Sequence, residues 1–358
     1  MWRLRIYIAL TITAAIFIVA GALCGIQIIF SFVHESGSIG KGHYGTWQAL
    51  SYVLLKLPSF LQIVIPMVGL LGSLMGLGLL AGNSELIAMR AAGISIRQIA
   101  GGVLLAGLLV MCVSFALTAY VGPKLQYVAS VHKTVALNQS ALLFTSQALW
   151  LKNQNNFVYV GKSLSANMIG QVTQYNLDHG KLRRILSARS ARYEPTTQKW
   201  TLFHATQLDF LTDKVQKHVY AQLPDIALIT PQMMRVVVSD HDELTLASLY
   251  AYIHYRQKNA LAAKNYQLQF WQTFMTPVSC LIMILLAIPF VFGPLRSATF
   301  GLRLLAGIAT GFLFYLVNQF FGSYSVVYHW PPFWGATLPN VCFALMLFGM
   351  LWWIARRL

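Results

Sequence analysis

Six long stretches of this chain contain no Asp, Glu, Lys or Arg, and this feature constrains the fold more than any other. The stretches are residues 6–33, 57–84, 98–123, 265–295, 304–328 and 330–355. Each can hold the ~20 apolar residues that a membrane-spanning helix needs. With 57% hydrophobic and 10% charged residues among 358, the composition is that of a polytopic α-helical membrane protein. The sequence therefore predicts six transmembrane helices, three on each side of a polar middle segment.

The arginines at the ends of these stretches predict the orientation of the chain. They flank ends that would share one side of the membrane: Arg3, Arg5, Arg90, Arg97, Arg296, Arg303, Arg356 and Arg357. The short loops opposite carry only Lys41 and Lys56 as lysines or arginines. Because cytoplasmic loops are enriched in Lys and Arg, both termini and residues 82–99 are predicted to be cytoplasmic and the middle segment to lie outside. The first stretch exceeds the ~7–15 apolar residues of a signal peptide, so we expect it to be a retained span.

Residues 82–99, GNSELIAMRAAGISIRQI, form a short polar island between the second and third stretches. Asn83 or Ser84 can cap the N-terminus of a short helix, and Glu85 lies in the first turn, where the helix dipole favours an anion. Gly93 is predicted to end this helix, and a second helical stretch to follow it. The predicted short helix offers a contact surface to a soluble partner, although an ordinary solvated loop explains the same pattern.

The polar middle segment shows short alternating stretches separated by turn signals. Predicted strands cover residues 148–152, 157–162, 170–176, 182–186, 188–193, 200–203, 207–211, 215–220 and 233–238. Such strands are typical of an antiparallel β-sandwich or jelly roll. The segment has 16 Lys and Arg against 8 Asp and Glu, which suits phosphate binding but equally a solvated basic face. The predicted domains are residues 1–123 (three spans and the short helix near 84–92), 124–264 (the β domain with helical flanks) and 265–358 (three spans).

Several kinds of chemistry are absent from the sequence. No Asp or Glu lies inside a predicted span, which argues against proton or sodium coupling and against an intramembrane acid or base. Cys24, Cys112, Cys280 and Cys342 fall in apolar stretches without His, Asp or Glu at ligand spacing, so neither metal sites nor disulfides are expected. The net charge of +16 is divided between membrane-flanking and external residues, which favours anionic lipid over nucleic acid as a partner. No nucleophile–base pattern indicates an enzyme, so any ATP hydrolysis belongs to another chain.

Four segments together resemble one known family. They are SELIAMRAAG at 84–93, NYQLQFW at 265–271, FVFGPLRS at 290–297 and VVYHWPPFWGATLP at 326–339. They are similar to the YjgP/YjgQ, or LptF/LptG, permeases, which are the membrane subunits of the lipopolysaccharide exporter of Gram-negative bacteria, with the LptG branch as the closer match. The resemblance covers nearly the whole chain. It implies six spans in a three-plus-three layout, with an inserted periplasmic β-jellyroll, in the bacterial inner membrane.

The resemblance also implies partners and a cargo. An LptF-like paralogue would pair with this chain, two copies of an LptB-like ATPase would bind ATP and Mg²⁺ beneath them, and an LptC-like protein would add one span and a jellyroll. The complex would extract lipopolysaccharide from the outer leaflet of the inner membrane and pass it to a periplasmic bridge. This chain itself would be non-catalytic and would hold no cofactor or metal.

The resemblance assigns the short helix to a groove of the ATPase and the first and fifth spans to a lateral opening for lipid. The residues expected at the ATPase are Ser84, Glu85, Leu86, Met89, Arg90, Ala91 and Ala92. Those expected at the acyl chains are Phe30, Phe32, Phe312, Tyr315, Phe320 and Phe321, and those expected at the phosphates are Lys41, Lys124 and Lys133. Each aromatic is equally explained as an ordinary lipid-facing or packing residue.

One region departs from the family pattern. LptG-like permeases tend to carry lysines near the outer end of the first span, where this chain has Phe30 and Ser31. Phosphate anchoring is therefore assigned to Lys41 or to the partner chain. Two other function classes fit the same pattern: a mechanotransducing subunit that couples an ATPase to an external domain without carrying lipid, and a scaffold with no ATPase.

Overall fold

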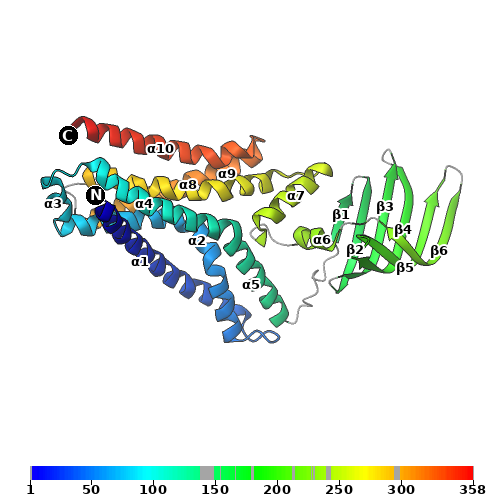
Figure 1. Ribbon diagram of the computed structural model, residues 1–358. Helices are drawn as coiled ribbons and strands as arrows, with labels where there is room; N and C mark the ends of the chain where they lie inside the picture. The colour runs from blue at the N-terminus through cyan, green and yellow to red at the C-terminus, as the bar shows by residue number, and fades with distance from the viewer. Residues whose placement is uncertain are drawn as a thin grey trace. The chain divides into compact units, whose positions relative to one another are not determined.

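The computed structural model describes residues 2–137, 149–153, 155–165, 167–178, 181–211, 214–226, 228, 230–238, 243–293 and 299–357. The chain divides into two compact units, each described here by itself. A helical unit comprises Met1–Gly37, Leu50–Ala129 and Lys264–Leu358, and a sheet unit comprises Ser38–Ala49 and Ser130–Ala263. Figure 1 shows the elements of both units along the chain.

Six helices of the described residues are long and apolar enough to span a membrane, as the sequence predicted. They are α1 (Trp2–Glu35), α2 (Thr46–Gly82), α4 (Ile96–Ala116) continuing through a π-helical segment (Leu117–Val121) into α5 (Gly122–Ala136), α8 (Lys264–Phe292), α9 (Phe300–Val327) and α10 (Pro332–Arg357). The short helix α3 (Glu85–Ala91) stands between α2 and α4. Both termini and α3 lie at the same end of the helical unit (Figure 1).

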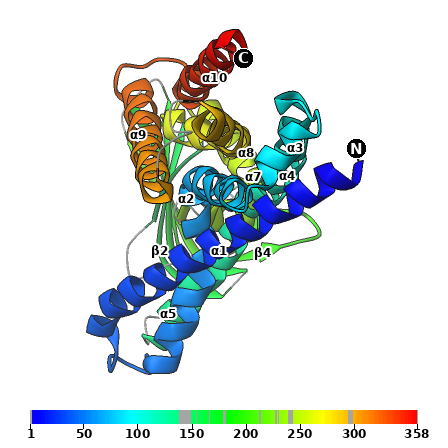
Figure 2. The same cartoon turned by 90° about the vertical axis from the view of Figure 1, so that its left-hand side faces the viewer.

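Helix α2 lies at the centre of the helical unit (Figure 2) because its glycines admit several neighbours. A Cβ atom at Gly72 would lie 2.5 Å from the Cα of Ile16, and one at Gly76 would lie 2.9 Å from the Cα of Ile12, so α1 packs directly on the α2 backbone. Gly69 faces α8, and two glycines of α9 face α2 in turn. Small residues allow helix backbones to approach in this way. The glycines of α2 therefore face three neighbouring helices, α1, α8 and α9.

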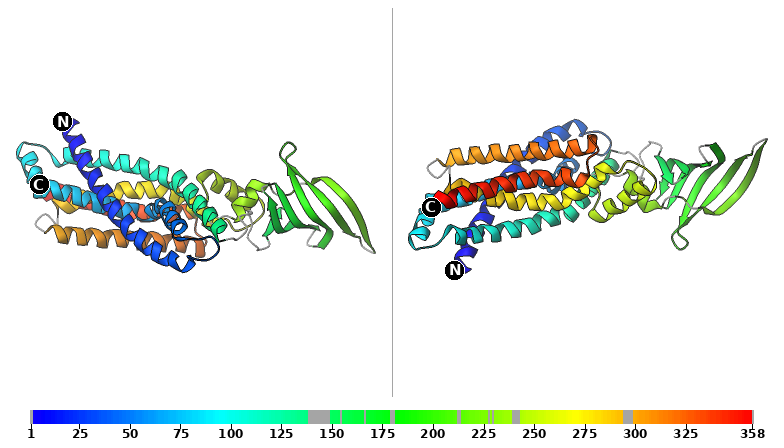
Figure 3. Two further views of the ribbon diagram at one scale, coloured as in Figure 1. Left: turned by 90° about the horizontal axis from the view of Figure 1, so that it is seen from below. Right: turned by 90° about the horizontal axis from the view of Figure 1, so that it is seen from above.

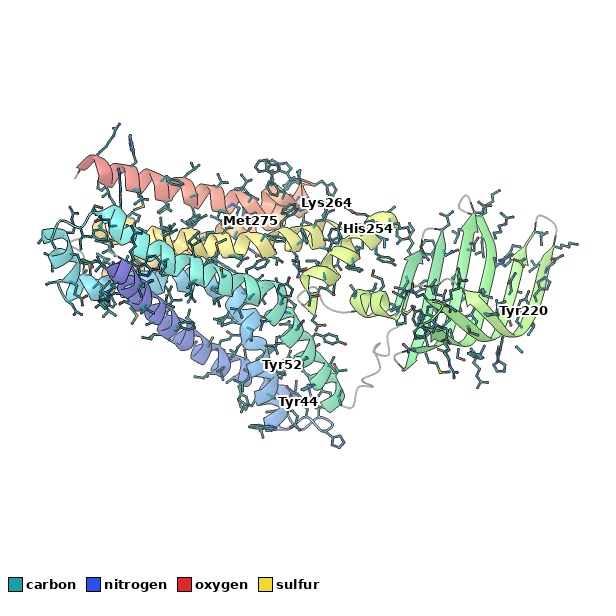
Figure 4. The ribbon with its side chains drawn as sticks, in the orientation of Figure 1. Tyr44, Tyr52, Tyr220, His254, Lys264 and Met275 are labelled. Atoms are coloured by element: carbon teal, nitrogen blue, oxygen red, sulfur yellow. The ribbon has the colours of Figure 1, made fainter. Side chains whose placement is uncertain are left out.

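A buried polar contact joins α10 to α8, which lie side by side in the right-hand view of Figure 3. The Ser279 hydroxyl donates to Asn340 Oδ1 at 2.6 Å, and Asn340 Nδ2 donates to the Met275 carbonyl at 3.3 Å. At the start of α8, Lys264 Nζ donates to the His329 carbonyl, just after α9, at 3.2 Å. Figure 4 labels Lys264 and Met275 along this helix. Polar contacts therefore tie both α9 and α10 to α8, since helices in lipid gain little from apolar burial alone.

The strands of the sheet unit form one antiparallel sheet in chain order within the described residues. They are β1 (Leu149–Asn153), β2 (Asn156–Ser165), β3 (Met168–Asp178), β4 (Lys181–Glu194), β5 (Lys199–Phe210) and β6 (Val215–Ile226). The predicted antiparallel β domain between the third and fourth spans is confirmed. Its described strands make a meander in a single sheet, whereas a jelly roll divides its strands between two sheets.

Two pairs of predicted short strands are single long strands. Strand β4 joins residues 182–186 to 188–193, and β5 joins 200–203 to 207–211. Within β4, Leu186 and Ala188 are buried, and Ser187 points to the opposite face, as the period of two residues requires. Ser187 therefore continues the alternation of one long strand.

The strand predicted at residues 233–238 is wrong, because these residues lie in helix α6 (Pro231–Val238). Thr230 Oγ1 accepts a hydrogen bond from the Met233 N–H at 3.4 Å, and Pro231 occupies the first helical position, where its missing N–H costs nothing. Met234 is buried in the same apolar cluster as residues of the sheet. A helix start signal and packing on the sheet thus override a run of β-branched residues.

One face of the sheet carries the core of this unit. Trp200 is its largest fully buried side chain, and the buried cluster to which Trp200 belongs takes residues from five strands. Helix α7 (Leu246–Lys258) adds Tyr255, whose hydroxyl donates to the Lys152 carbonyl of β1 at 2.7 Å. Burial raises the pKa of the Tyr255 hydroxyl. Figure 4 labels Tyr220 on β6, at the far edge of the sheet from β1.

Candidate functional site

Helix α3 is the short helix that the sequence predicted between the second and third spans. At its C-terminus the Gly93 N–H donates to the Arg90 carbonyl at 3.0 Å, and the Ile94 N–H donates to the Met89 carbonyl at 3.1 Å. Gly93 has a positive φ of 80°, which glycine adopts without strain. This pair of bonds is the usual glycine-dependent helix end. The prediction that Gly93 ends the helix is confirmed.

The N-terminus of α3 differs from the expected cap. Ser84 stands at the cap position, but its backbone is left-handed, with φ 61°, and its side chain makes no capping hydrogen bond within the described chain. Glu85 follows in the first turn, where the helix dipole stabilises its carboxylate. The Asn83 side chain donates to Glu85 Oε1 at 3.5 Å. The charge of Glu85, rather than a serine cap, therefore stabilises the start of α3.

Glu85 also has a partner that the sequence did not reveal. The Tyr7 hydroxyl of α1 donates to Glu85 Oε2 at 2.8 Å, across 78 residues of sequence. An aromatic residue near the end of a span is ordinarily an interface anchor, so no local signal marks Tyr7. The N-terminus of α1 comes close to α3 only because α1 crosses the bundle at an angle (Figure 2).

The two faces of α3 have different neighbours. Leu86 is 4% exposed and belongs to the core of the helical unit, with Met89 packed beside it. Ile87 is 66% exposed and lies next to the exposed Arg90. Leu86 therefore packs α3 onto the bundle, and its assignment to the ATPase contact stays a prediction. Ile87, which is not among the predicted contact residues, is an apolar residue of α3 open to a partner. Leu86 and Met89 are three residues apart, as are Ile87 and Arg90, and this spacing places each pair on one face of the helix.

A pocket of about 500 Å³ lies beside α3. The described residues that line it are Ala81, Leu86, Ile87, Arg90, Ala91, Val291, Phe292 and Arg303. They come from the end of α2, from α3, from the end of α8 and from the start of α9. The remaining predicted contact residues of this region, Ser84 and Ala92, are exposed. An apolar lining with guanidinium groups from two helices suits an acidic protein segment with apolar neighbours.

Helix α9 has one packed face and one open apolar face. Gly307 and Gly311 close onto α2, and Phe314, only 5% exposed, meets Phe343 of α10 edge to face with ring centroids 5.0 Å apart. On the open side Phe312 is 56% exposed. The other predicted lipid residues of this helix are Tyr315 and Phe320, which are exposed, and Phe321, which is half-buried. The exposed Phe312 and the buried Phe314 are only two residues apart, so α9 has an open face and a packed face along the same segment.

Helix α1 is packed mainly along its first half. Its buried residues are Ile8, Ala9, Ile12, Ala15, Ile16 and Glu35. Phe30, in the second half, is 70% exposed, and Phe32 is half-buried. No residue of the described chain lies within 4 Å of a Cβ atom built at Gly21 or Gly25. These two glycines therefore make no close helix packing with other described residues of the chain.

The lysines predicted to bind phosphate are Lys41, Lys124 and Lys133. Lys133 of α5 lies over the ring of Tyr44, with its Nζ 5.9 Å from the ring centroid. A backbone hydrogen bond of 2.7 Å to the Ala136 carbonyl holds the loop of Lys41 beside the end of α5. The loop that carries Lys41 and the part of α5 that carries Lys133 are therefore neighbours within the sheet unit. Lys124 is exposed and belongs to the helical unit.

This arrangement of six spans, a short helix at one end and an inserted sheet matches a known family over almost its whole length. The family described as lipopolysaccharide export system permease LptF/LptG matches residues 6–356. The chain belongs to the LptF/LptG family. The lipopolysaccharide export system permease protein LptG of Escherichia coli (strain K12) is 33% identical over 353 residues, which are 98% of this chain and 97% of the relative. LptG of Haemophilus influenzae is 32% identical over 352 residues, with the same coverage.

The part of the chain that the structure describes contains no group of three His, Cys, Asp or Glu side chains able to hold a metal ion. Its notable features are surfaces instead: the exposed side of α3 with its pocket, and the open apolar faces of α1 and α9.

Proposed function

We propose that this chain is the LptG-like permease subunit of an ABC transporter. The transporter extracts lipopolysaccharide from the outer leaflet of the inner membrane and passes it to a periplasmic bridge towards the outer membrane. A separate LptB-like ATPase dimer binds ATP and Mg²⁺ and supplies the power, and this chain holds no cofactor. The observation that carries the proposal is the open apolar side of α1 and α9, on helices otherwise packed against α2.

The chemistry of the cargo agrees with these surfaces. Lipopolysaccharide has several acyl chains and a phosphorylated head, so its extraction needs an apolar surface and cations. Phe30, Phe312 and Phe320 supply exposed apolar area. Lys41 and Lys133 supply cations on neighbouring elements of the sheet unit. Both requirements are therefore met by residues of this chain.

The partner surfaces follow the same logic. The exposed side of α3, with Ile87 and Arg90, docks on the ATPase at the cytoplasmic end, where both termini also lie. An LptF-like paralogue and the single span of an LptC-like protein cover apolar area that the chain leaves open. In the described sheet β1 and β6 are the outer strands, and such strands can pair with strands of other chains. This supports a periplasmic β domain that meets the domains of its partners.

Photocrosslinking in the assembled complex tests the lipid path. A photoreactive amino acid is placed at Phe30, Phe312 or Phe320, and at Phe314 as the control on the packed face of the same helix. We expect lipopolysaccharide adducts at the first three positions and none at the control. Absence of adducts at every position, with the ATPase still bound, would contradict the proposal and favour a mechanotransducing subunit that carries no lipid.

Substitution of Glu85 tests the ATPase contact. Glu85→Ala is expected to weaken binding of the ATPase at least tenfold, because the carboxylate at the start of α3 is lost, while the protein stays folded. Glu194→Ala makes the same chemical change in the sheet unit and serves as the control. Normal ATPase binding by the Glu85 variant would remove α3 from the contact, and a chain that never binds an ATPase would be a scaffold.

A further inference from the structure

The hydrogen bond between Tyr7 and Glu85 joins two elements that have separate tasks in the proposed function. Tyr7 belongs to α1, whose second half carries the exposed Phe30. Glu85 belongs to α3, which is assigned to the ATPase. The bond is short, at 2.8 Å, and runs between two side chains far apart in sequence. It is therefore a direct physical link between the lipid-facing helix and the ATPase-facing helix.

The first turns of α1 are held closely on both sides of Tyr7. A Cβ atom at Gly102 of α4 would lie 2.9 Å from the Cβ of Ile8 and 3.2 Å from the carbonyl oxygen of Arg5. Helix α4 begins only a few residues after α3 ends. The starts of α1, α3 and α4 therefore form one packed corner, in which the Tyr7 hydroxyl supplies the link to α3.

Helix α1 can carry a displacement from this corner to its other end. It runs without interruption from Trp2 to Glu35 and contains no proline, so it has no built-in kink. At 1.5 Å per residue, Tyr7 and Phe30 are about 35 Å apart along the helix. Its second half is largely exposed, so it can change its tilt with few contacts to break. A small shift at α3 is thereby turned into a movement of the lipid-facing half.

We infer that Tyr7 is a positioning residue, whose hydroxyl orients the Glu85 carboxylate for the ATPase and ties α1 to α3. The inference rests on the proposed function and goes beyond it, because it assigns a role to a residue of α1 that does not itself contact the ATPase or the cargo. Tyr7 occupies Oε2 of Glu85, while Oε1 makes only a contact of 3.5 Å with Asn83, at the limit of hydrogen bonding. Oε1 is therefore the oxygen left for a cation or N–H group of the partner.

The test uses a double-mutant cycle in the assembled complex. The variants are Tyr7→Phe, Glu85→Ala and the two together. Tyr7→Phe removes one oxygen atom and keeps the ring. Tyr120→Phe is the matched control, because Tyr120 is similarly exposed and its hydroxyl makes no hydrogen bond with any described residue. Three quantities are measured for each: the affinity for the ATPase by titration, the lipopolysaccharide released per ATP hydrolysed, and the melting temperature of the complex.

We expect Tyr7→Phe to lower both the affinity and the lipid released per ATP by about 2- to 10-fold, the range that corresponds to one hydrogen bond. The melting temperature should stay unchanged, since a partly exposed hydrogen bond contributes little to folding. In the Glu85→Ala background, Tyr7→Phe should have no further effect, because the acceptor is already absent. Tyr120→Phe should match the wild type in all three measurements.

Several results would overturn the inference. Tyr7→Phe could behave as the wild type, could tighten ATPase binding, or could keep its full effect in the Glu85→Ala background. A melting temperature that falls together with activity would show a structural role instead. These outcomes are distinct from failure of the proposed function, in which the wild-type complex itself binds no ATPase or releases no lipopolysaccharide.

Discussion

Helices α2 and α8 differ sharply from α1 and α9, although all four are apolar enough to cross a membrane. Of the most apolar stretch, 72% is buried in α2 and 61% in α8, but only 6% in α1 and 17% in α9. The stretch in α1 is nevertheless the most apolar among the six candidate spans of the described chain. Apolar character therefore does not decide which helices form the core of this protein.

The difference lies in how many neighbours a helix meets through small residues and polar contacts: the glycines of α2 meet three helices, whereas Gly307 and Gly311 of α9 both meet α2. In lipid the bilayer is as apolar as a side chain, so helices associate through close backbone approach and hydrogen bonds. Helix α2 has glycines at its contacts, and α8 has the buried Ser279 that meets Asn340. The second half of α1 has branched and aromatic residues with no such feature facing the described chain. Its apolar surface is left for lipid or for other chains.

The largest effect is expected on the packed face of α9. Phe314→Ala should lower the free energy of unfolding by about 3 kcal/mol, because it leaves a cavity beside Phe343. Phe312→Ala, two residues away on the open face, should change it by less than ~0.5 kcal/mol. Denaturant unfolding of the purified protein in detergent gives both values. Equal losses would show that the two faces of α9 do not differ as described.

A smaller loss is expected where α1 approaches α2. Gly72→Ala should destabilise the protein by about 2 kcal/mol, since the new methyl group meets the Ile16 backbone and α1 must shift. Gly21→Ala is the control on the open part of α1, where alanine favours the helix by up to ~1 kcal/mol over glycine. The melting temperatures of the two variants should therefore move in opposite directions. A stable Gly72 variant would contradict the close packing of α1 on α2.

The polar contact of α8 with α10 is expected to matter less. Asn340→Ala should cost about 1 kcal/mol, because interhelical hydrogen bonds within membranes contribute modestly. Thr337→Ala is the control one turn away, since the Thr337 hydroxyl donates within its own helix, to the Phe333 carbonyl at 2.8 Å. Unfolding in detergent should distinguish the two. If Thr337→Ala lowered the free energy of unfolding as much as Asn340→Ala, the hydrogen bonds from Asn340 to α8 would make no contribution of their own to stability.

The smallest effect on stability is expected in the sheet unit, for the ion pair between Arg184 and Asp209. Arg184 Nε donates to Asp209 at 2.6 Å, which lowers the pKa of the Asp209 carboxyl. A lowered pKa means that this pair stabilises the fold above the ordinary Asp pKa of ~3.9, and that the contribution is lost as pH falls through the folded-state pKa. Arg184→Ala should therefore reduce stability at pH 7 by less than ~1 kcal/mol and should reduce the acid-dependent loss.

Arg183→Ala is the control for this measurement. Its ion pair with Asp178, at 2.8 Å, is more exposed on both partners than the pair of Arg184. Unfolding midpoints of the purified chain between pH 3 and pH 7 are compared for both variants and the wild type. If the Arg183 variant changed the pH dependence as much as the Arg184 variant, exposure would not explain the difference between the pairs.

Much of the fold was predictable because its signals are local. Charge-free stretches predicted the six spans, Gly93 predicted the end of α3, and turn residues predicted the hairpins of the sheet. The strand predicted at residues 233–238 is wrong because these residues belong to a helix that starts at Thr230-Pro231 and packs on the sheet. For the candidate site, the sequence located α3 but did not show that Leu86 is buried, since burial depends on what packs against the helix.

The sequence by itself determined that the chain spans a membrane six times, that a β domain is inserted between the third and fourth spans, and which family it belongs to. Only the tertiary structure decided which spans are core and which keep an open apolar face, and that Tyr7 meets Glu85. The physical reason is that hydropathy and turn signals act within about 20 neighbouring residues. Helix packing in lipid and side-chain contacts across 78 residues depend instead on where backbones can approach each other.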